Sequence, residues 1–142
     1  MAQVILVDTG YFLALLDRND SFHKRAVEVS KELTDPLVTT WPVLTETCLM
    51  IQRRLGDNVL LRFMDSWVAG AFTAHGIDSS EVPRARTLIK QYADLPMDLA
   101  DCSLVLLAEK LGQGKILTTD QRDFGAYRWK SRKPFLNLLA LE

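Results

Sequence analysis

The chain has 142 residues, 48% of them hydrophobic, and a formal net charge of −1 at pH 7. This length and apolar content suit one domain with a substantial core, so we expect a single domain over residues 1–142. The near-zero charge excludes a protein that coats DNA by bulk electrostatics, but not a nucleic-acid enzyme with a local basic rim. No apolar run approaches the ~20 residues of a transmembrane helix.

The two cysteines, Cys48 and Cys102, fall in helical patterns, where we expect buried apolar side chains and no disulfide or metal site. We expect a cytoplasmic protein with no membrane association.

The first two thirds of the chain alternate short apolar runs with helical patterns. In order, the pattern predicts a strand over 4–7, helices over 11–16 and 22–33, a strand over 37–40, helices over 42–55 and 57–68, a weak strand over 72–77 and a helix over 80–92. The run at 4–7 is continuously apolar, which is typical of a strand buried on both faces in a parallel sheet. Polar residues at the helix starts are the expected N-caps: Ser21, Asp57 or Asn58, and Ser79 or Ser80.

The stretch over 96–124 is the most informative. A helix predicted over 98–111 is apolar nearly all round, from Leu99 to Leu111, so we expect it to be packed inside the domain. Gly112 ends it, a short strand follows over 115–118, and 135–141 is the candidate for a last strand. Because strands and helices alternate, the sequence predicts an α/β sandwich with a mostly parallel sheet.

Five carboxylates lie among apolar or small residues, and most have no neighbouring Lys or Arg: Asp8, Glu46, Asp101, Asp120 and Asp123. Asp8 and Asp120 follow predicted strands, and parallel α/β sheets bind ligands beyond the carboxyl ends of their strands. If the acids converge there, each pair ~4–5 Å apart repels by roughly 3–4 kcal/mol at an effective dielectric constant of ~20. A hard divalent cation, Mg²⁺ or Mn²⁺, relieves this repulsion and activates water for attack on phosphorus.

Each acid also has a structural explanation. Asp98 and Asp101, at the start of the apolar helix, fit an N-cap and a first-turn acid that favours the helix dipole. Asp8 fits a turn at a strand end, Glu46 a helix surface, and Asp123 a solvated position. The set is therefore stronger evidence for a site than any one member.

Three stretches together resemble a known family. They are VDTGYFLALLDRND at 7–20, TTWPVLTETCLMI at 39–51 and MDLADCSLVLLAEKLGQGKILTTDQRDF at 97–124. They resemble the PIN-domain nucleases and, within them, the VapC-like toxins of bacterial toxin–antitoxin pairs. The third stretch is the most specific, because an acid precedes an apolar helix and Thr-x-Asp-x-x-Asp-Phe follows the next strand.

The resemblance implies a PIN-like three-layer sandwich with a central, mostly parallel sheet flanked by helices. It implies an endoribonuclease that hydrolyses RNA phosphodiester bonds with Mg²⁺ or Mn²⁺. By position, the resemblance implies that the catalytic and metal-binding acids are Asp8, Glu46, Asp101 and Asp120, with Asp123 as an accessory metal-binding acid. Thr9 and Thr118 would hydrogen-bond the ligands or the metal's water, and Asp98 would have a capping or supporting role. It also implies two protein partners: an antitoxin that blocks the acidic cleft, and a second copy of the chain, for which apolar helix faces around 12–16 or 59–68 are candidates.

A basic segment near the C-terminus offers candidate RNA-binding residues, namely Arg122, Arg128 and Lys130, with Tyr127 and Trp129 interleaved. Arginine beside aromatic rings can hold phosphates and stack unpaired bases. The alternative is a solvated segment whose rings pack on the core.

Other functional classes fit less well. A receiver domain needs paired acids after the first strand, and a haloacid-dehalogenase-like phosphatase needs an acid two residues after the first, but Thr9 and Gly10 follow Asp8. A non-catalytic RNA- or protein-binding domain of the PIN fold is the main alternative. A nuclease acting on DNA or structured flaps also stays open.

Overall fold

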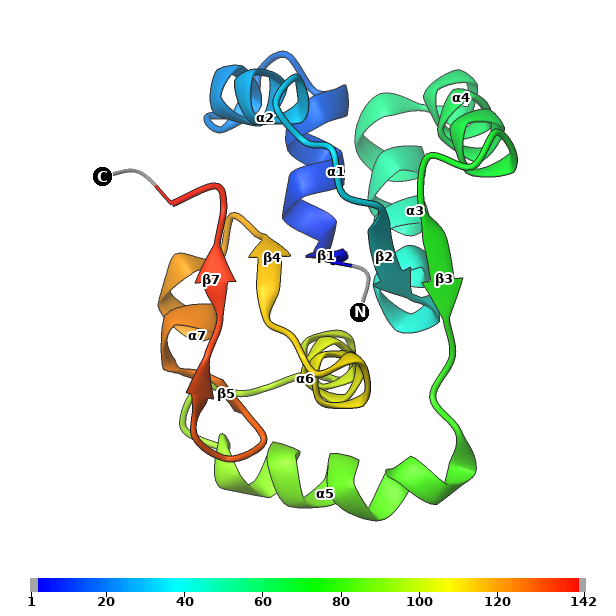
Figure 1. Cartoon of the computed structure of the whole chain (residues 1–142). Coiled ribbons are helices and arrows are strands. Elements are labelled where there is room, and N and C mark those ends of the chain that lie inside the picture. The colour runs from blue at the N-terminus through cyan, green and yellow to red at the C-terminus, as the bar shows by residue number, and fades with distance from the viewer. Residues whose placement is uncertain (1–2, 141–142) are drawn as a thin grey trace.

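A computed structural model describes residues 3–140 and places a five-stranded sheet at the centre (Figure 1). The strand order is β3-β2-β1-β4-β7, formed by β1 (Ile5–Val7), β2 (Leu37–Thr40), β3 (Thr73–His75), β4 (Lys115–Leu117) and β7 (Leu136–Asn137). All four pairings within this sheet are parallel. β1 lies in the middle and is buried along its whole length, as its continuous apolar run predicted.

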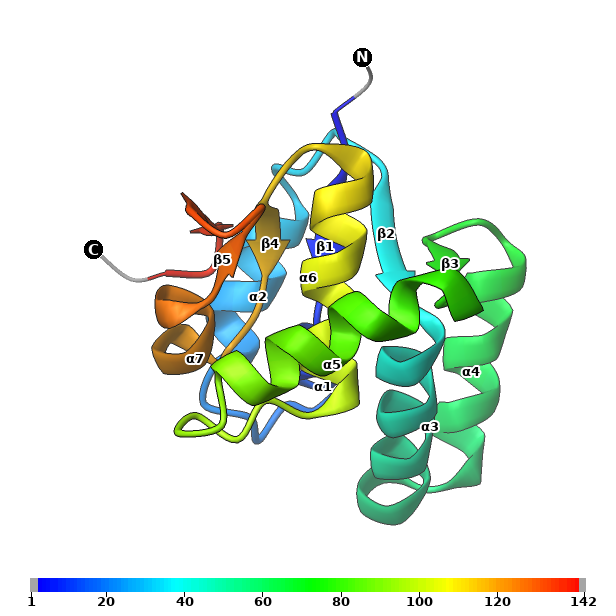
Figure 2. The same ribbon diagram turned by 90° about the horizontal axis from the view of Figure 1, so that it is seen from below.

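Helices cover both faces of the sheet, so the fold is a three-layer sandwich. They are α1 (Thr9–Leu16), α2 (His23–Ser30), α3 (Trp41–Leu55), α4 (Asp57–Val68), α5 (Val82–Gln91), α6 (Leu99–Leu111) and α7 (Gln121–Ala126), with a 3₁₀ turn η1 (Ser79–Glu81) before α5. Figure 1 shows α1 and α2 over one face and α6 over the other, with α5 outside α6. Figure 2 shows α3 continuing beyond the end of β2 and α4 running back beside it. The predicted α/β class with a mostly parallel sheet is confirmed.

The helix α6 is the buried helix that the sequence predicted. Asp98 is its N-cap, and Gly112, with φ of 70°, ends it in the left-handed conformation that favours glycine. Seven consecutive residues, 102–108, are buried between the sheet and α5. The prediction that Leu99 is packed inside is wrong, because this side chain is 51% exposed in the first turn, where it borders an apolar hollow with Val82 and Ile89.

Several predicted helix starts are wrong by one or two residues. Phe22 and not Ser21 occupies the N-cap of α2, and Gly56 occupies that of α4. The N-cap of η1 is Asp78, whose carboxylate accepts from the Ser80 amide while the Glu81 carboxylate accepts from the Asp78 amide. The Asp-x-x-Glu spacing of this capping box was present in the sequence.

The C-terminal part differs most from the prediction. The residues after Asp120 form α7, a helix that the sequence reading missed. They are followed by an antiparallel pair, β5 (Arg128–Trp129) and β6 (Lys133–Pro134). The last strand, β7, is limited to two residues of the predicted 135–141 segment, of which residue 141 lies outside the described residues.

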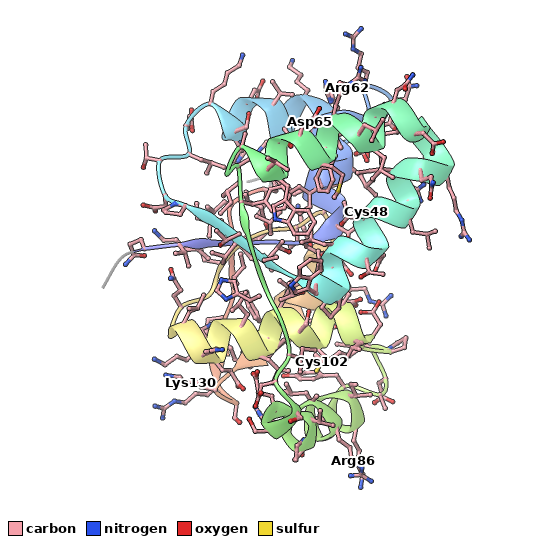
Figure 3. The ribbon with its side chains drawn as sticks, turned by 90° about the vertical axis from the view of Figure 1, so that its right-hand side faces the viewer. Cys48, Arg62, Asp65, Arg86, Cys102 and Lys130 are labelled. Atoms are coloured by element: carbon pink, nitrogen blue, oxygen red, sulfur yellow. The ribbon has the colours of Figure 1, made fainter. Side chains whose placement is uncertain are left out.

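Neither cysteine forms a disulfide, as predicted, but the predicted burial is confirmed for Cys102 only. Cys102 is buried in α6 and Cys48 is half-buried in α3, so they lie on different elements (Figure 3). Within residues 3–140, no helix is both long enough and apolar enough to cross a membrane.

Candidate active site

Two neighbouring strands bring Asp8 and Asp120 to the same edge of the sheet. β1 and β4 pair in parallel with Val7 opposite Leu117, and the Asp8 amide donates to the Leu117 carbonyl at 3.0 Å. Asp8 then serves as N-cap of α1, and Asp120 serves as N-cap of α7. Gly10 leaves room for the Thr119 side chain, whose hydroxyl a Cβ at this position would overlap unless it moved. The start of α1 and the segment after β4 therefore meet closely.

Asp8 is the most buried acid of the site, at 9% exposure. One carboxylate oxygen accepts from the Thr9 amide at 2.9 Å, and the other accepts from the Thr118 hydroxyl at 2.8 Å. Burial raises the pKa of Asp8 to about 6, with smaller contributions from the negative charges of Glu46 and Asp120. The buried carboxylate is therefore costly to ionise unless a cation lies beside it.

Asp101 lies in the first turn of α6 and faces the same edge. Its amide donates to the Asp98 carboxylate at 2.8 Å, which is the N-cap bond of the helix. Its own carboxylate accepts from the Tyr127 hydroxyl at 2.8 Å. Burial, and next the charge of Asp98, raises the pKa of Asp101 to about 7.

Glu46 joins the site from α3, which begins directly after β2. Thr40 caps that helix through a bond from the Val43 amide, and the Pro42 ring occupies its first turn. Glu46 is half-buried, and its pKa is raised by burial and by the charge of Asp98. The negative charge of Asp98 thus helps to raise the pKa of both Glu46 and Asp101.

Asp101, Asp120 and Asp123 form the tightest group. Each offers a carboxylate oxygen, and these oxygens all lie within 4.8 Å of one another. The Asp123 amide donates to the Asp120 carboxylate at 3.1 Å, and the pKa of Asp123 is raised by burial and by Asp120. This spacing suits one cation bound by oxygen ligands.

The acids line one cleft of about 400 Å³ at the carboxyl edge of the sheet. Its acidic lining residues are Asp8, Asp20, Glu46, Asp98, Asp101, Asp120 and Asp123. Arg54 is the one basic residue that lines it within the described part of the chain. Asp20 and Arg54 were not among the predicted site residues.

Comparison with known proteins shows the family. The family model described as PIN domain matches residues 5–130. The chain belongs to the PIN-domain family. Ribonuclease VapC26 of Mycobacterium tuberculosis is 27% identical over 124 residues, which cover 87% of this chain and 92% of that protein.

The crystal structure of M. tuberculosis VapC20, a toxin that cleaves the sarcin–ricin loop, has the same PIN-domain fold. It matches with a TM-score of 0.76 and 17% identity over 84% of this chain and 92% of that one. The resemblance to VapC-like PIN-domain nucleases that the sequence suggested is confirmed.

The three basic residues that the sequence suggested for RNA binding in this PIN domain make different contacts. The Arg128 side chain donates to the carbonyls of Gly125 and Tyr127. The Lys130 amide bonds to Glu109, near the other end of α6, and the residue lines a separate hollow there (Figure 3). Arg122 is exposed, and its positive charge offsets part of the rise in the pKa of Asp123.

The rings interleaved with those basic residues are part of the core. Tyr127 is 0% exposed and Trp129 is 7% exposed, and the Trp129 indole donates to the Pro134 carbonyl. They cannot stack RNA bases without unfolding of this segment. The alternative in which the rings pack on the core is the one found.

Thr9 and Thr118 contact Asp8 in different ways. Thr118 uses its hydroxyl, whereas Thr9 uses its amide and turns its hydroxyl toward the Val43 carbonyl at 3.4 Å. Thr47 in α3 donates to the Thr9 hydroxyl at 3.1 Å. The Thr9 side chain therefore ties α1 to α3 and does not contact a carboxylate.

Proposed function

We propose that this PIN domain is a metal-dependent endoribonuclease that hydrolyses RNA phosphodiester bonds and is the toxin of a toxin–antitoxin pair. The observation that carries the proposal is the convergence of Asp101, Asp120 and Asp123 within 4.8 Å, beside the buried Asp8. The names of two similar proteins support it, since one is a ribonuclease and the other a toxin that cleaves the sarcin–ricin loop.

The donor set fits a hard divalent cation. The cleft offers carboxylate oxygens from seven acids, and burial, together with the charges of neighbouring acids, raises the pKa values of Asp8 and Asp101. Within residues 3–140 the one ion pair, between Arg84 and Glu109, involves no residue of the cleft. Mg²⁺ or Mn²⁺ would be held by Asp8, Glu46, Asp101 and Asp120, with Asp123 as an accessory ligand.

A bound divalent cation would supply an activated water and offset the negative charge that develops on the phosphoryl oxygens. The chain's own residues hold the carboxylates in place before the substrate arrives. Thr118 donates to the Asp8 carboxylate and accepts from the Asp120 amide at 3.0 Å, so one hydroxyl holds the side chain of one acid and the backbone of the other. Such fixed groups do not have to reorganise during the reaction.

Arg54 is the residue best placed to hold an RNA phosphate. It lies in the last turn of α3, two turns after Glu46, and borders the cleft directly. A guanidinium binds phosphate oxygens through paired N–H donors, and it would offset part of the acidic field that repels RNA. Arg122 lies beside Asp123 and is the second candidate for holding a phosphate. Arg128 donates to backbone carbonyls, and Lys130 lines a separate hollow.

The antitoxin, the homodimer and the cytoplasmic location stay proposals drawn from the family. Of the two apolar faces suggested for a dimer, the one on α4 is exposed, through Leu61, Met64 and Val68. The one on α1 is mostly core, since Phe12 is 4% exposed.

The test is cleavage of a mixed RNA pool by the purified chain with Mn²⁺, with Mg²⁺ and with EDTA. Cleavage should require metal and fall at least ~100-fold in Asp120→Asn, because the charge of one ligand is lost. Asp65→Asn is the matched control, since Asp65 is exposed on α4 away from the cleft (Figure 3). Undiminished cleavage in Asp120→Asn would contradict the mechanism. A folded chain that neither cuts RNA nor binds Mn²⁺ would favour the non-catalytic PIN-fold alternative.

A further inference from the structure

Tyr127 occupies a fixed position at the end of α7. It is fully buried, and its ring meets those of Tyr92 and Phe124 edge to face at centroid distances of 5.0 and 5.1 Å. Its amide donates to the Asp123 carbonyl at 2.9 Å. The ring has therefore little freedom to move, and the direction of its hydroxyl group is set by the core.

The Tyr127 hydroxyl donates to Oδ2 of Asp101 at 2.8 Å. Within the described residues this is the one hydrogen bond that the Asp101 carboxylate accepts. The bond joins two helices, since Asp101 lies in the first turn of α6 and Tyr127 caps the end of α7. α7 also carries Asp123 and has Asp120 as its N-cap, and each of these two acids offers a carboxylate oxygen within 4.8 Å of one of Asp101.

Two of the other aspartates of the cleft have donors close by, in their own segment or on the neighbouring strand end. Asp8 is held by Thr9 and Thr118, and Asp120 by the amide of Asp123. Asp101 has no such donor, and free rotation about its side-chain bonds would spread its oxygens over several positions. The phenol of Tyr127 supplies the missing constraint.

We propose that Tyr127 is a positioning residue that fixes the Asp101 carboxylate relative to Asp120 and Asp123 and so prepares the cluster for a divalent cation. This inference rests on the proposed function, because it concerns the same metal site. The bond occupies Oδ2 and leaves Oδ1 of Asp101 available to the cation. Loss of a hydrogen-bonding partner of a metal ligand typically weakens metal binding ~10–100-fold.

The test is Mn²⁺ binding to the full chain by isothermal titration calorimetry, without RNA. Tyr127→Phe removes the hydroxyl and keeps the ring with its edge-to-face contacts. We expect its Kd for Mn²⁺ to rise at least ~10-fold. In cleavage assays, the Mn²⁺ concentration for half-maximal rate should rise by a similar factor, and the rate at saturating Mn²⁺ should largely recover.

Tyr92→Phe is the matched control. The Tyr92 ring packs on the same Tyr127 ring, and its hydroxyl accepts from the Arg128 amide at 3.0 Å, but it contacts no acid of the cleft. This variant should bind Mn²⁺ like the parent protein. Equal weakening in both variants would overturn the inference, because it would show a general loosening of the aromatic cluster.

A third variant separates this inference from the proposed function. Asp101→Asn should weaken Mn²⁺ binding if the acids form a metal site. If it does so while folded Tyr127→Phe binds Mn²⁺ normally, the proposed function stands and the role of Tyr127 is overturned. If the parent protein binds no Mn²⁺, the metal site itself is wrong, and the inference falls with it.

Discussion

The Thr118 hydroxyl donates to Oδ2 of Asp8 at 2.8 Å, from a strand end 110 residues further along the chain. The Thr118 hydroxyl oxygen in turn accepts from the Asp120 amide at 3.0 Å, so the buried Thr118 side chain connects two acids of the cleft. β1 and β4 are adjacent, which is why a residue of one strand end can reach an acid of the other. The relationship links the fold directly to the geometry of the proposed metal site.

Replacement of Thr118 by valine should therefore weaken metal binding while the protein still folds. Thr118→Val keeps the shape of the side chain but removes the donor to Asp8 and the acceptor for Asp120. We expect Mn²⁺ affinity to fall ~10-fold or more, and the free energy of unfolding to fall by about 1–3 kcal/mol. Calorimetry and urea unfolding in EDTA measure the two effects.

Thr39→Val is the control for that experiment. Thr39 is equally buried, and its hydroxyl donates to the Val7 carbonyl at 2.7 Å on the other side of β1, but it contacts no acid. It should lose stability to a similar extent and keep its Mn²⁺ affinity. If both variants lose affinity alike, Thr118 acts only through the fold.

The stability of the metal-free protein should depend on pH through Asp8. Its pKa is about 6 in the folded chain, against a usual 3.8, so the folded state holds the proton more tightly. The corresponding stabilisation is complete below pH 3.8 and is lost as the pH rises through about 6. In EDTA, we expect this group alone to lower the free energy of unfolding by about 1 kcal/mol between pH 5 and pH 8.

Urea unfolding of the parent protein and of Asp8→Asn at both pH values checks this. The variant cannot ionise at position 8, so its stability should change less over this interval, although Asp101 contributes in the same direction. An equal pH dependence in the two proteins would contradict the role assigned to Asp8. Added Mn²⁺ should stabilise the parent protein more at pH 8 than at pH 5, because the ion binds the deprotonated carboxylates.

The convergence of the acids was largely predictable from the sequence. Asp8 and Asp120 follow apolar runs that form adjacent parallel strands, and such strands end at the same edge of a sheet. Asp101 is placed by a helix whose long apolar run predicted that it packs inside the domain. Arg54 could also have been found, because Glu46, Met50 and Arg54 are spaced four residues apart on α3 and share one face.

Other features depend on contacts between segments far apart in the chain. Nothing near Tyr127 indicates that its partner is Asp101, 26 residues earlier, and its basic neighbours suggested an RNA-binding segment instead. Asp20 serves locally as the acceptor for the Phe22 amide at 2.8 Å, which explains its presence without any reference to the cleft. The helix α7 was missed because it has six residues, too few for a periodic pattern.

Arg54 provides the sharpest test of how RNA is held. Arg53 and Arg54 are both exposed in the last turn of α3, so both interact alike with the helix dipole, but Arg54 alone lines the cleft. Arg54→Gln should weaken the binding of a labelled single-stranded RNA to the inactive Asp120→Asn protein. Because one phosphate contact is lost, the slope of log affinity against log salt concentration should decrease by ~0.7, and Arg53→Gln should leave it unchanged. Fluorescence anisotropy at several salt concentrations measures both quantities.

Equal effects of the Arg54 and Arg53 substitutions would contradict a phosphate contact by Arg54, because they would show that the positive charge acts at long range. RNA would then have to be held by other groups, and Arg122 beside Asp123 is the next residue to replace.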